Sequence, residues 1–339
     1  MKNNNLFLIK ISILLSQVIF SINSFSQNST TLDSTSILSY GDKLVVKLNI
    51  DTQSNTYLIN DKLANTNLVV TPNNSLRFSL SLDYEFIGVS IGFSPKFLPG
   101  NDDDDLKGKS SFTDYGFRFF LGNWTQELIY SNIQGYYIEN TQDFFPGWEE
   151  NKDPYLQFPD LKAIQWGGST SYILNERFSF RNIVYQTEWQ RKSAGSFIPK
   201  LAYNFNRFSN KINDLKSIEN AFDIKIAPSY YYTLVMHRNW FVSAFLSPAI
   251  GMRFSKSMEV ENGVTLENKN QHFIKTLDCG LQLGFSSDKF IFGLNLNFDG
   301  NWYNEDKTTN IEDDKFYAKI YFGYRFDSPK VIRKLFYKE

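Results

Sequence analysis

The segment YQTEWQRKSAGSF, residues 185–197, gathers side chains that could take part in catalysis. It holds one carboxylate, two cations and two serine hydroxyls: Glu188, Arg191, Lys192, Ser193 and Ser196. A serine nucleophile needs a histidine within hydrogen-bond reach and a third group that orients this histidine. The chain has only His237 and His272, and it contains neither an HxSNG-like phospholipase pattern nor a GxSxG elbow. A hydrolase would have to combine Ser193 or Ser196 with His237, and no spacing supports that arrangement.

The acidic run NDDDD, residues 101–105, is the second group of chemically capable side chains. Hard cations such as Ca²⁺ take several oxygen ligands, and the possible ligands here are Asp102, Asp103, Asp104 and Asp105. The run lacks the spaced ligands and the fixed glycine of an EF-hand loop. We expect a solvated external loop, and the sequence predicts no metal ion or other cofactor.

Alternating apolar and polar residues indicate which elements hold these groups. The clearest case is SLRFSLSLDYEF, residues 75–86, and the same period returns in residues 277–285, 289–299 and 315–326. Successive side chains of a strand point to opposite faces, so each segment has one apolar and one polar face. Strands of ~9 to 11 residues suit a tilted membrane crossing. In such a barrel the apolar face meets lipid and the polar face lines the lumen.

Counting these segments predicts an all-β fold, a transmembrane antiparallel outer-membrane β-barrel. About twelve strands are expected, near residues 42–50, 75–86, 87–97, 111–121, 124–138, 161–174, 177–190, 222–236, 239–254, 271–285, 289–302 and 314–326. Segments 54–60 and 197–206 could be further strands, and both together would give fourteen. Adding 197–206 alone would put the turns near residues 176 and 238 on opposite sides of the membrane, so we place it in a loop.

Short turns and long polar connections alternate along the chain, as they do in bacterial outer-membrane barrels. The long connections are expected at about 98–110, 140–160, 191–221, 255–270 and 303–313. The motif QRKSAGS would then lie at a barrel mouth, where strand 177–190 runs into connection 191–221. Its residues are Gln190, Arg191, Lys192, Ser193, Ala194, Gly195 and Ser196. Gly195 allows a sharp turn, and the expected role is a loop anchor at the rim, with contact to a ligand as the alternative.

The polar faces of the predicted strands carry charges of both signs. The expected lumen-facing charges are Lys47, Arg77, Asp83, Glu85, Arg118, Asp223, Lys225, Arg253, Asp278, Asp299, Lys319 and Arg325. Because the two signs occur in similar numbers, we expect the interior to pair charges across itself. A narrow pore and a filled scaffold both fit such a lumen.

The first 26 residues have the pattern of a secretory signal peptide, with Lys2 and Lys10 beside the apolar stretch 11–22. Past residue 26 no apolar run reaches the ~18 residues of a spanning helix. The predicted layout is a cleaved signal peptide at 1–26, a flexible N-terminal extension at 27–41, the barrel at 42–326 and a C-terminal tail at 327–339.

The overall composition agrees with a secreted barrel. Aromatic residues make up 17% of the chain although the mean hydropathy is −0.34, so apolar and polar residues are interleaved. With 35 Lys and Arg against 36 Asp and Glu, nothing favours a nucleic-acid partner. The single cysteine, Cys279, rules out an intramolecular disulfide. The expected location is the outer membrane, with its lipids and the barrel-assembly machinery as partners.

Four blocks of sequence resemble a known family. They are TPNNSLRF…LDYEFIGVSIGF (71–93), FPDLKAIQWGGSTSYILNERFSF (158–180), QTEWQRKSAGSF (186–197) and YFGYRF (321–326). Together they are similar to a Bacteroidota family known as domain of unknown function 4421, and QRKSAGS is the most specific piece. The resemblance implies an outer-membrane-type β-barrel and carries no activity or catalytic residue over to this chain.

The leading hypothesis is a non-enzymatic outer-membrane β-barrel that acts as a narrow pore or transport protein, or as a surface scaffold. One alternative is a barrel enzyme acting on lipid, of the lipase or acyltransferase type. The other is a secreted soluble β-sandwich that binds a ligand, in which the aromatic faces of two sheets would pack on each other.

Overall fold

The computed structural model describes residues 36–52, 55–61, 65–237, 239–304, 309–312 and 315–329. These ranges belong to one unit that begins at Ser36. The predicted signal peptide lies outside the described residues, and so does most of the predicted C-terminal tail. No helix within the described ranges is long and apolar enough to cross a membrane.

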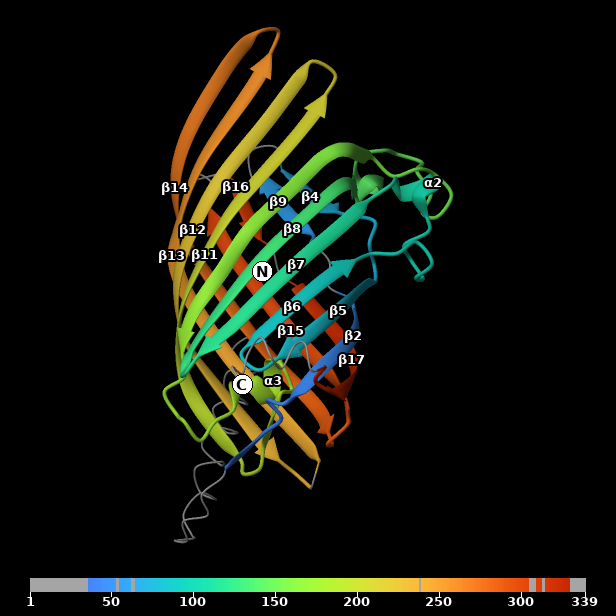
Figure 1. The fold of residues 1–339 in the computed structure, drawn as a ribbon. Coiled ribbons are helices and arrows are strands. Elements are labelled where there is room, and N and C mark those ends of the chain that lie inside the picture. Colours follow the sequence, from blue (N-terminus) through green and yellow to red (C-terminus); the bar gives the residue numbers. More distant parts are fainter. Residues whose placement is uncertain are drawn as a thin grey trace. The chain divides into compact units, whose positions relative to one another are not determined.

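Long strands close into one antiparallel ring (Figure 1). In the described part of the chain the ring has twelve strands: β2 (Lys43–Asp51), β5 (Arg77–Tyr84), β6 (Ile87–Phe93), β7 (Ser111–Leu121), β8 (Trp124–Ile138), β9 (Gln157–Tyr172), β11 (Ala194–Ile212), β12 (Leu215–Val235), β13 (Trp240–Glu261), β14 (Val264–Ser286), β15 (Phe290–Asn304) and β17 (Lys315–Asp327). Each strand pairs with the next, and β17 pairs with β2 from Lys319↔Asp51 to Asp327↔Lys43. The predicted outer-membrane-type barrel is confirmed. The sandwich alternative is wrong because one sheet closes on itself instead of two sheets packing face to face.

One predicted strand and one predicted loop exchange places. Residues 177–190, expected to cross the membrane, form helix α3 (Phe180–Val184) and the short strand β10 (Glu188–Gln190). Residues 197–206, expected in a loop, lie within β11. The exchange keeps the strand count at twelve, and it also keeps the turns near 176 and 238 on the same side of the barrel.

The expected connections 191–221 and 255–270 are mostly strand. Hairpins β11–β12 and β13–β14 continue as two-stranded ribbons to tight turns at residues 213–214 and 262–263 (Figure 1). Asn213, Asn262 and Gly263 have φ angles of 53°, 49° and 79°. Two-residue hairpin turns need this left-handed backbone, which Asn and Gly adopt most readily. The polar composition of these segments therefore reflects strands that project beyond the apolar belt.

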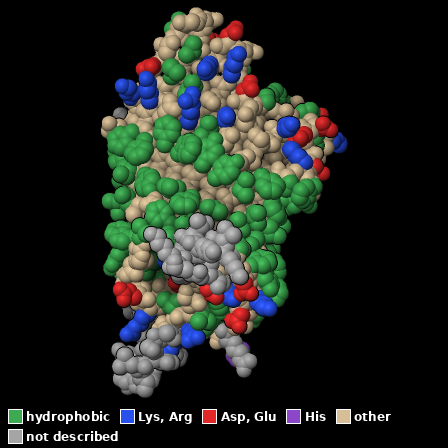
Figure 2. All heavy atoms as spheres, in the orientation of Figure 1, with side chains coloured by type: hydrophobic (Ala, Val, Ile, Leu, Met, Phe, Trp, Pro, Cys, Tyr) green, Lys and Arg blue, Asp and Glu red, His purple; other side chains and the backbone are tan. Residues whose placement is uncertain are grey.

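Outward-facing side chains of the ring form an apolar belt. Figure 2 shows hydrophobic side chains gathered in a band, with charged side chains above and below it. Examples that remain exposed on several strands are Leu48, Ile226, Ile250, Phe273 and Phe322. Their inward neighbours Lys47, Lys225 and Arg253 are at most partly exposed. This alternation is the pattern of a barrel whose outer face meets lipid.

The two ends of the barrel differ. At the short-turn end, residues 85–86, 122–123 and 287–289 join neighbouring strands. The long-connection end carries residues 94–110 with helix α2 (Asp104–Lys107), and residues 139–156 with the 3-10 helix η1 (Thr141–Asp143). The names short-turn end and long-connection end refer to these two sides of the barrel.

Three short strands cross the long-connection end. They are β3 (Tyr57–Asp61), β4 (Thr66–Thr71) and β16 (Thr309–Glu312), paired in the order β8–β4–β3–β16–β15. Residues 54–60, one possible additional barrel strand, thus contribute to β3 outside the ring. Val70 of β4 and Ile138 of β8 are buried in one apolar cluster, against which Tyr57 and Ile59 of β3 pack. The result is a bridge over part of the mouth.

Candidate functional site

A segment between β9 and β11 fills the lumen at the short-turn end. This plug, residues 173–193, contains α3 and β10 (Figure 1). Strand β1 (Ile37–Ser39) pairs with β10, from Ile37↔Gln190 to Ser39↔Glu188. Residues 37–39 are therefore paired strand, although the sequence predicted a flexible extension over 27–41.

Ser179 starts the plug helix. Its side chain accepts a hydrogen bond from the backbone N–H of Asn182 at 2.9 Å, as an N-cap does. Its hydroxyl also donates to Glu188 at 2.6 Å, and Arg181 lies 3.4 Å from the same carboxylate. Local hydrogen bonds of this kind favour a capped turn over a strand, which explains why the alternating residues 177–190 do not cross the membrane.

Lys47 of β2 holds the plug to the barrel wall. Its ammonium donates to the side-chain oxygen of Gln186 at 2.6 Å and to the carbonyl of Val184 at 2.8 Å. The same ammonium forms an ion pair with Asp83 of β5 at 3.0 Å, and both side chains are buried. A Cβ at Gly88 would come within 2.8 Å of the ring of Tyr185, so the wall is thin where this plug residue packs.

Arg325 of β17 is the second anchor. Its Nε donates to the carbonyl of Gln186 at 3.0 Å, and its guanidinium also donates to Ser286 at 2.9 Å. The guanidinium carbon lies 4.0 Å from the centre of the Tyr40 ring. Gln186 has a φ of 56°, so its backbone turns into the left-handed region where both anchors meet it. Two cations of the wall thus converge on one plug residue.

An aromatic layer separates the plug from the rest of the lumen. Tyr185 meets Phe120 edge to face at 5.0 Å between ring centres, and Phe180 meets Tyr231 at 5.1 Å. Tyr231 also stacks on Phe245 at 5.1 Å. Burial raises the pKa of the Tyr185 phenol. These rings belong to one apolar cluster between the plug and strands β7, β12 and β13.

The QRKSAGS motif builds the plug. The buried side chain of Gln190 accepts from the backbone N–H of Ser179 at 2.6 Å and donates to the carbonyls of Arg177 and Lys192, both at 2.8 Å. Ser196 accepts from the backbone N–H of Asn175 at 3.0 Å. These bonds tie both ends of the plug to each other. The motif lies at the short-turn end, whereas the sequence placed it at the mouth with the long connections.

Other residues of the motif have separate positions. Arg191 and Lys192 are exposed, and Glu188 pairs with Arg181. Ser193 accepts from the backbone N–H of Val235 at 3.0 Å. Gly195 lies in β11 opposite Tyr232, where a Cβ would come within 2.5 Å of the Tyr230 hydroxyl. Its role is thus close packing against a neighbouring strand, not a sharp turn.

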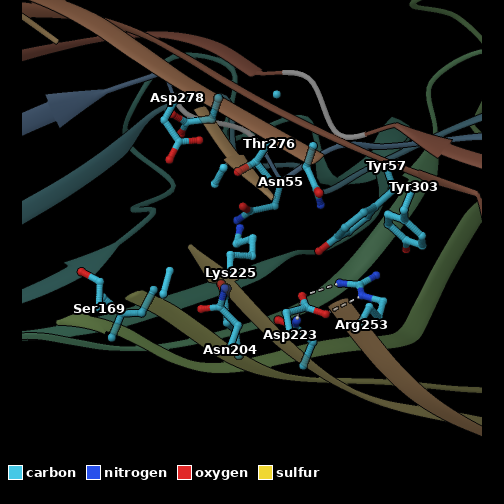
Figure 3. Close-up of a pocket in the computed structure, with 18 of the residues that line it drawn as sticks. Asn55, Tyr57, Ser169, Asn204, Asp223, Lys225, Arg253, Thr276, Asp278 and Tyr303 are labelled. Carbon is cyan, nitrogen blue, oxygen red and sulfur yellow. Dashed lines mark hydrogen bonds and ion pairs between the residues drawn. The ribbon is translucent and has the colours of Figure 1, made fainter. Parts of the chain in front are cut away.

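A cavity of about 600 Å³ occupies the lumen toward the long-connection end (Figure 3). Strands β8, β9 and β11–β15 form its wall, and Tyr57 and Ile59 of the bridge also line it. No described residue of the plug lines it. Small side chains such as Ala202, Ala227 and Ala249 leave the space open.

One side of the cavity is held by a buried ion pair. Arg253 of β13 meets Asp223 of β12 in a two-pronged contact, with N–O distances of 2.7 and 2.8 Å (Figure 3). The guanidinium carbon lies 4.3 Å from the centre of the Tyr303 ring. Asn206 donates to the same carboxylate at 3.1 Å. Paired guanidinium and carboxylate groups with extra hydrogen bonds keep their geometry when buried, so this side is rigid.

The remaining predicted lumen charges are found on the wall with one exception. Arg77 pairs with Asp51 at 2.7 Å, Arg118 pairs with Glu127 at 2.6 Å, and Lys319 lies opposite Asp51 in the sheet. The exception is Glu85, which occupies the β5–β6 turn with a φ of 51°.

The groups that suggested other chemistry lie apart from this lumen. In the described chain no hydrogen bond joins His237 to Ser193 or Ser196. In the acidic run, Asp103 pairs with Lys107 and Asp104 pairs with Lys96. Two of its carboxylates therefore form ion pairs at helix α2. Asp102 and Asp105 belong to the same long connection. The described residues contain no group of three or more His, Cys, Asp or Glu placed to hold a metal ion.

Some lumen residues were missed by sequence reasoning. Lys200 and Asn204 line the cavity, but the sequence placed them in a loop. The signal was present, since Ile198, Lys200 and Ala202 alternate with outward-facing apolar residues of β11. Glu127 also lines the cavity and pairs with Arg118.

Fold and site together define an outer-membrane-type β-barrel that is closed at one end by its own chain and holds a cavity at the other. The chain belongs to the family described as Domain of unknown function (DUF4421), whose model matches residues 31–326. The family resemblance predicted from the sequence blocks is thereby confirmed. No curated protein matches the sequence.

Solved structures of outer-membrane barrels are similar to this chain at low identity. The outer membrane protease OmpT of Escherichia coli is 8% identical, with a TM-score of 0.36 over 87% of this chain and 100% of that one. The β domain of the Bordetella autotransporter BrkA is 10% identical, with a TM-score of 0.35 over 84% and 100%. The P. putida toluene transporter TodX is 8% identical, with a TM-score of 0.29 over 85% and 90%. Nothing about activity follows from these values.

Proposed function

We propose that this protein is a non-enzymatic, gated passage for a small polar solute in the outer membrane. The solute enters the lumen from the long-connection end and leaves when the plug moves. In bacterial barrels the short turns face the periplasm and the longer connections face outward, so entry is from the cell exterior. The apolar belt supports this location.

The observation that carries the proposal is the division of the lumen into a polar cavity and a plug. The cavity volume of about 600 Å³ falls within the range of ligand sites. A filled scaffold gains stability from close packing, so an open space of this size would cost it stability. We therefore favour passage over a surface scaffold.

The plug is held in a way that suits opening. Its two cationic anchors, Lys47 and Arg325, meet one residue, Gln186, and most of these bonds end on carbonyl oxygens or on an amide. Water can replace such partners when the plug shifts, because each ammonium or guanidinium would then face a hydrated lumen. A shift of the short segment 184–186 would release both anchors from the plug.

Arg325→Met tests this gate. The variant loses hydrogen bonds from a charged donor, each worth about 1.5–3 kcal/mol, so we expect openings in a planar bilayer to become about 10- to 100-fold more frequent. The matched control is Arg77→Met, which removes a lumen arginine that pairs with Asp51 away from the plug. Equal opening frequencies in Arg325→Met, Arg77→Met and the unaltered protein, with all three barrels folded, would contradict the gate.

A further inference from the structure

Four inward-facing oxygen groups gather on neighbouring strands in the cavity. Asp278 of β14 lies directly opposite Asp299 of β15, and one step along the same faces Thr276 lies opposite Asn301. All four line the cavity. Two carboxylates directly opposite each other destabilise a sheet. This arrangement therefore favours a positively charged group between them.

Two of these oxygens lack hydrogen-bond partners among the described residues. The Oγ1 atom of Thr276 and the Oδ1 atom of Asn301 are buried, and neither has a hydrogen-bond partner in the described chain. Thr276 is only 5% exposed. Buried polar atoms without partners cost stability, and these two face a space large enough for a ligand. A donor such as an ammonium group or a peptide N–H would satisfy both.

Two inward-facing lysines on neighbouring strands have no close carboxylate partner among the described residues. Lys200 of β11 and Lys225 of β12 line the cavity, and no carboxylate oxygen of the described residues lies within 4.0 Å of either ammonium. Four other lumen cations have such a partner: Lys47, Arg77, Arg118 and Arg253. The cavity thus carries lysines on β11 and β12 and two opposed carboxylates on β14 and β15.

From this polarity we infer that the cavity binds a short zwitterionic peptide of two or three residues. Its carboxylate meets Lys200 and Lys225, and its ammonium meets Asp278, Asp299, Thr276 and Asn301. Lys225 aligns in the sheet register with Ile274, so Asp278 lies two strand spacings away and four residues along, a backbone separation of about 17 Å at ~4.8 Å per strand and ~3.4 Å per residue. The side chains of Lys225 and Asp278, which both line the cavity, shorten this separation within the lumen. A peptide of three residues spans about 10 Å at ~3.3–3.6 Å per residue. The inference rests on the proposed passage of a small polar solute and specifies which solute class the passage takes.

Calorimetry with the full-length barrel in detergent tests this inference. The probes are trialanine, N-acetyl-trialanine and trialanine amide, which differ only in their end charges. We expect trialanine to bind. Each capped form should bind with an affinity at least about tenfold lower, since each loses one charge-assisted contact. Equal affinities for the three probes, or no binding of trialanine, would overturn the inference.

Variants of the wall locate the two ends of the peptide. Asp278→Asn should weaken trialanine about tenfold and abolish its advantage over N-acetyl-trialanine, while its advantage over trialanine amide persists. Lys200→Gln combined with Lys225→Gln should show the reverse. Lys319→Gln, which changes a lumen lysine outside the cavity lining, is the matched control and should change neither of the two advantages.

If Ca²⁺ binds in a way that depends on Asp278 and no peptide binds, the ligand of the cavity would be a metal ion and not a peptide. Absence of peptide binding while Arg325→Met still opens the barrel would leave the gate intact and remove only this solute class.

Discussion

Excision of the plug is expected to convert the closed barrel into a continuously open pore. Replacing residues 176–192 by a short Gly–Ser linker keeps the ring intact, because the two ends of the plug already lie together. Asn175 donates to the carbonyl of Gly195 at 2.7 Å and to Ser196 at 3.0 Å. The aromatic layer loses Phe178, Phe180 and Tyr185, and water can then reach Lys47 and Arg325.

The expected size of the change follows from the anchors. Two charged anchors at about 1.5–3 kcal/mol each keep the closed state favoured by at least about 100-fold, so the open probability in a planar bilayer should rise by about that factor. The control removes residues 142–153 from the connection at the other end, most of which are exposed. Unchanged conductance in a folded, plug-free barrel would mean that another part of the chain closes the lumen.

Asp83→Asn is expected to cost about 3 kcal/mol of unfolding free energy. The ion pair with Lys47 is buried, with side-chain exposures of 6% and 2%. Removing one partner of a buried pair costs about 3–5 kcal/mol because it leaves an uncompensated charge. The measurement is equilibrium unfolding of the barrel in urea, in lipid vesicles.

A double variant distinguishes the charge effect from a packing effect. Lys47→Met with Asp83→Asn removes both charges and should be more stable than Asp83→Asn alone, since apolar groups of similar size often replace a buried pair without cost. The recovery is partial because the Lys47 hydrogen bonds to Val184 and Gln186 are lost as well. Asp327→Asn serves as the exposed control, because its pair with Lys43 at 2.5 Å lies at the surface and is worth less than about 1 kcal/mol. A double variant as unstable as Asp83→Asn would refute the buried-charge explanation.

The ring was predictable because its strands must satisfy two environments at once. Lipid outside and charge inside impose period two on every crossing, so segments such as 111–121 and 124–138 match their strands β7 and β8 at both ends. The plug has no such constraint. Phe178 and Phe180 alternate with polar residues but pack on aromatic residues within the lumen, and a period-two pattern cannot tell this environment from lipid.

The site was less predictable than the ring. Lys200 and Asp278 lie far apart in the sequence, and only closure of the ring with its actual register brings them to one cavity. Because the prediction exchanged one strand for one loop, the strand count was correct, but Lys200 was placed outside the predicted lumen. The role of Gln190 was also hidden, because hydrogen bonds of its amide to three backbone groups leave no sequence pattern.

Sided chemical labelling of the cavity is the most direct test of a lumen that is open at one end and plugged at the other. The protein carries Cys279→Ala and Lys225→Cys, so that a single thiol lies in the cavity. Asn262→Cys at a hairpin tip of the long-connection end and Ser287→Cys at the short-turn end report orientation in vesicles. A membrane-impermeant thiol reagent should label Lys225→Cys from the long-connection end only, and from both ends once the plug is excised. Equal labelling from both ends of the intact barrel would contradict the plug.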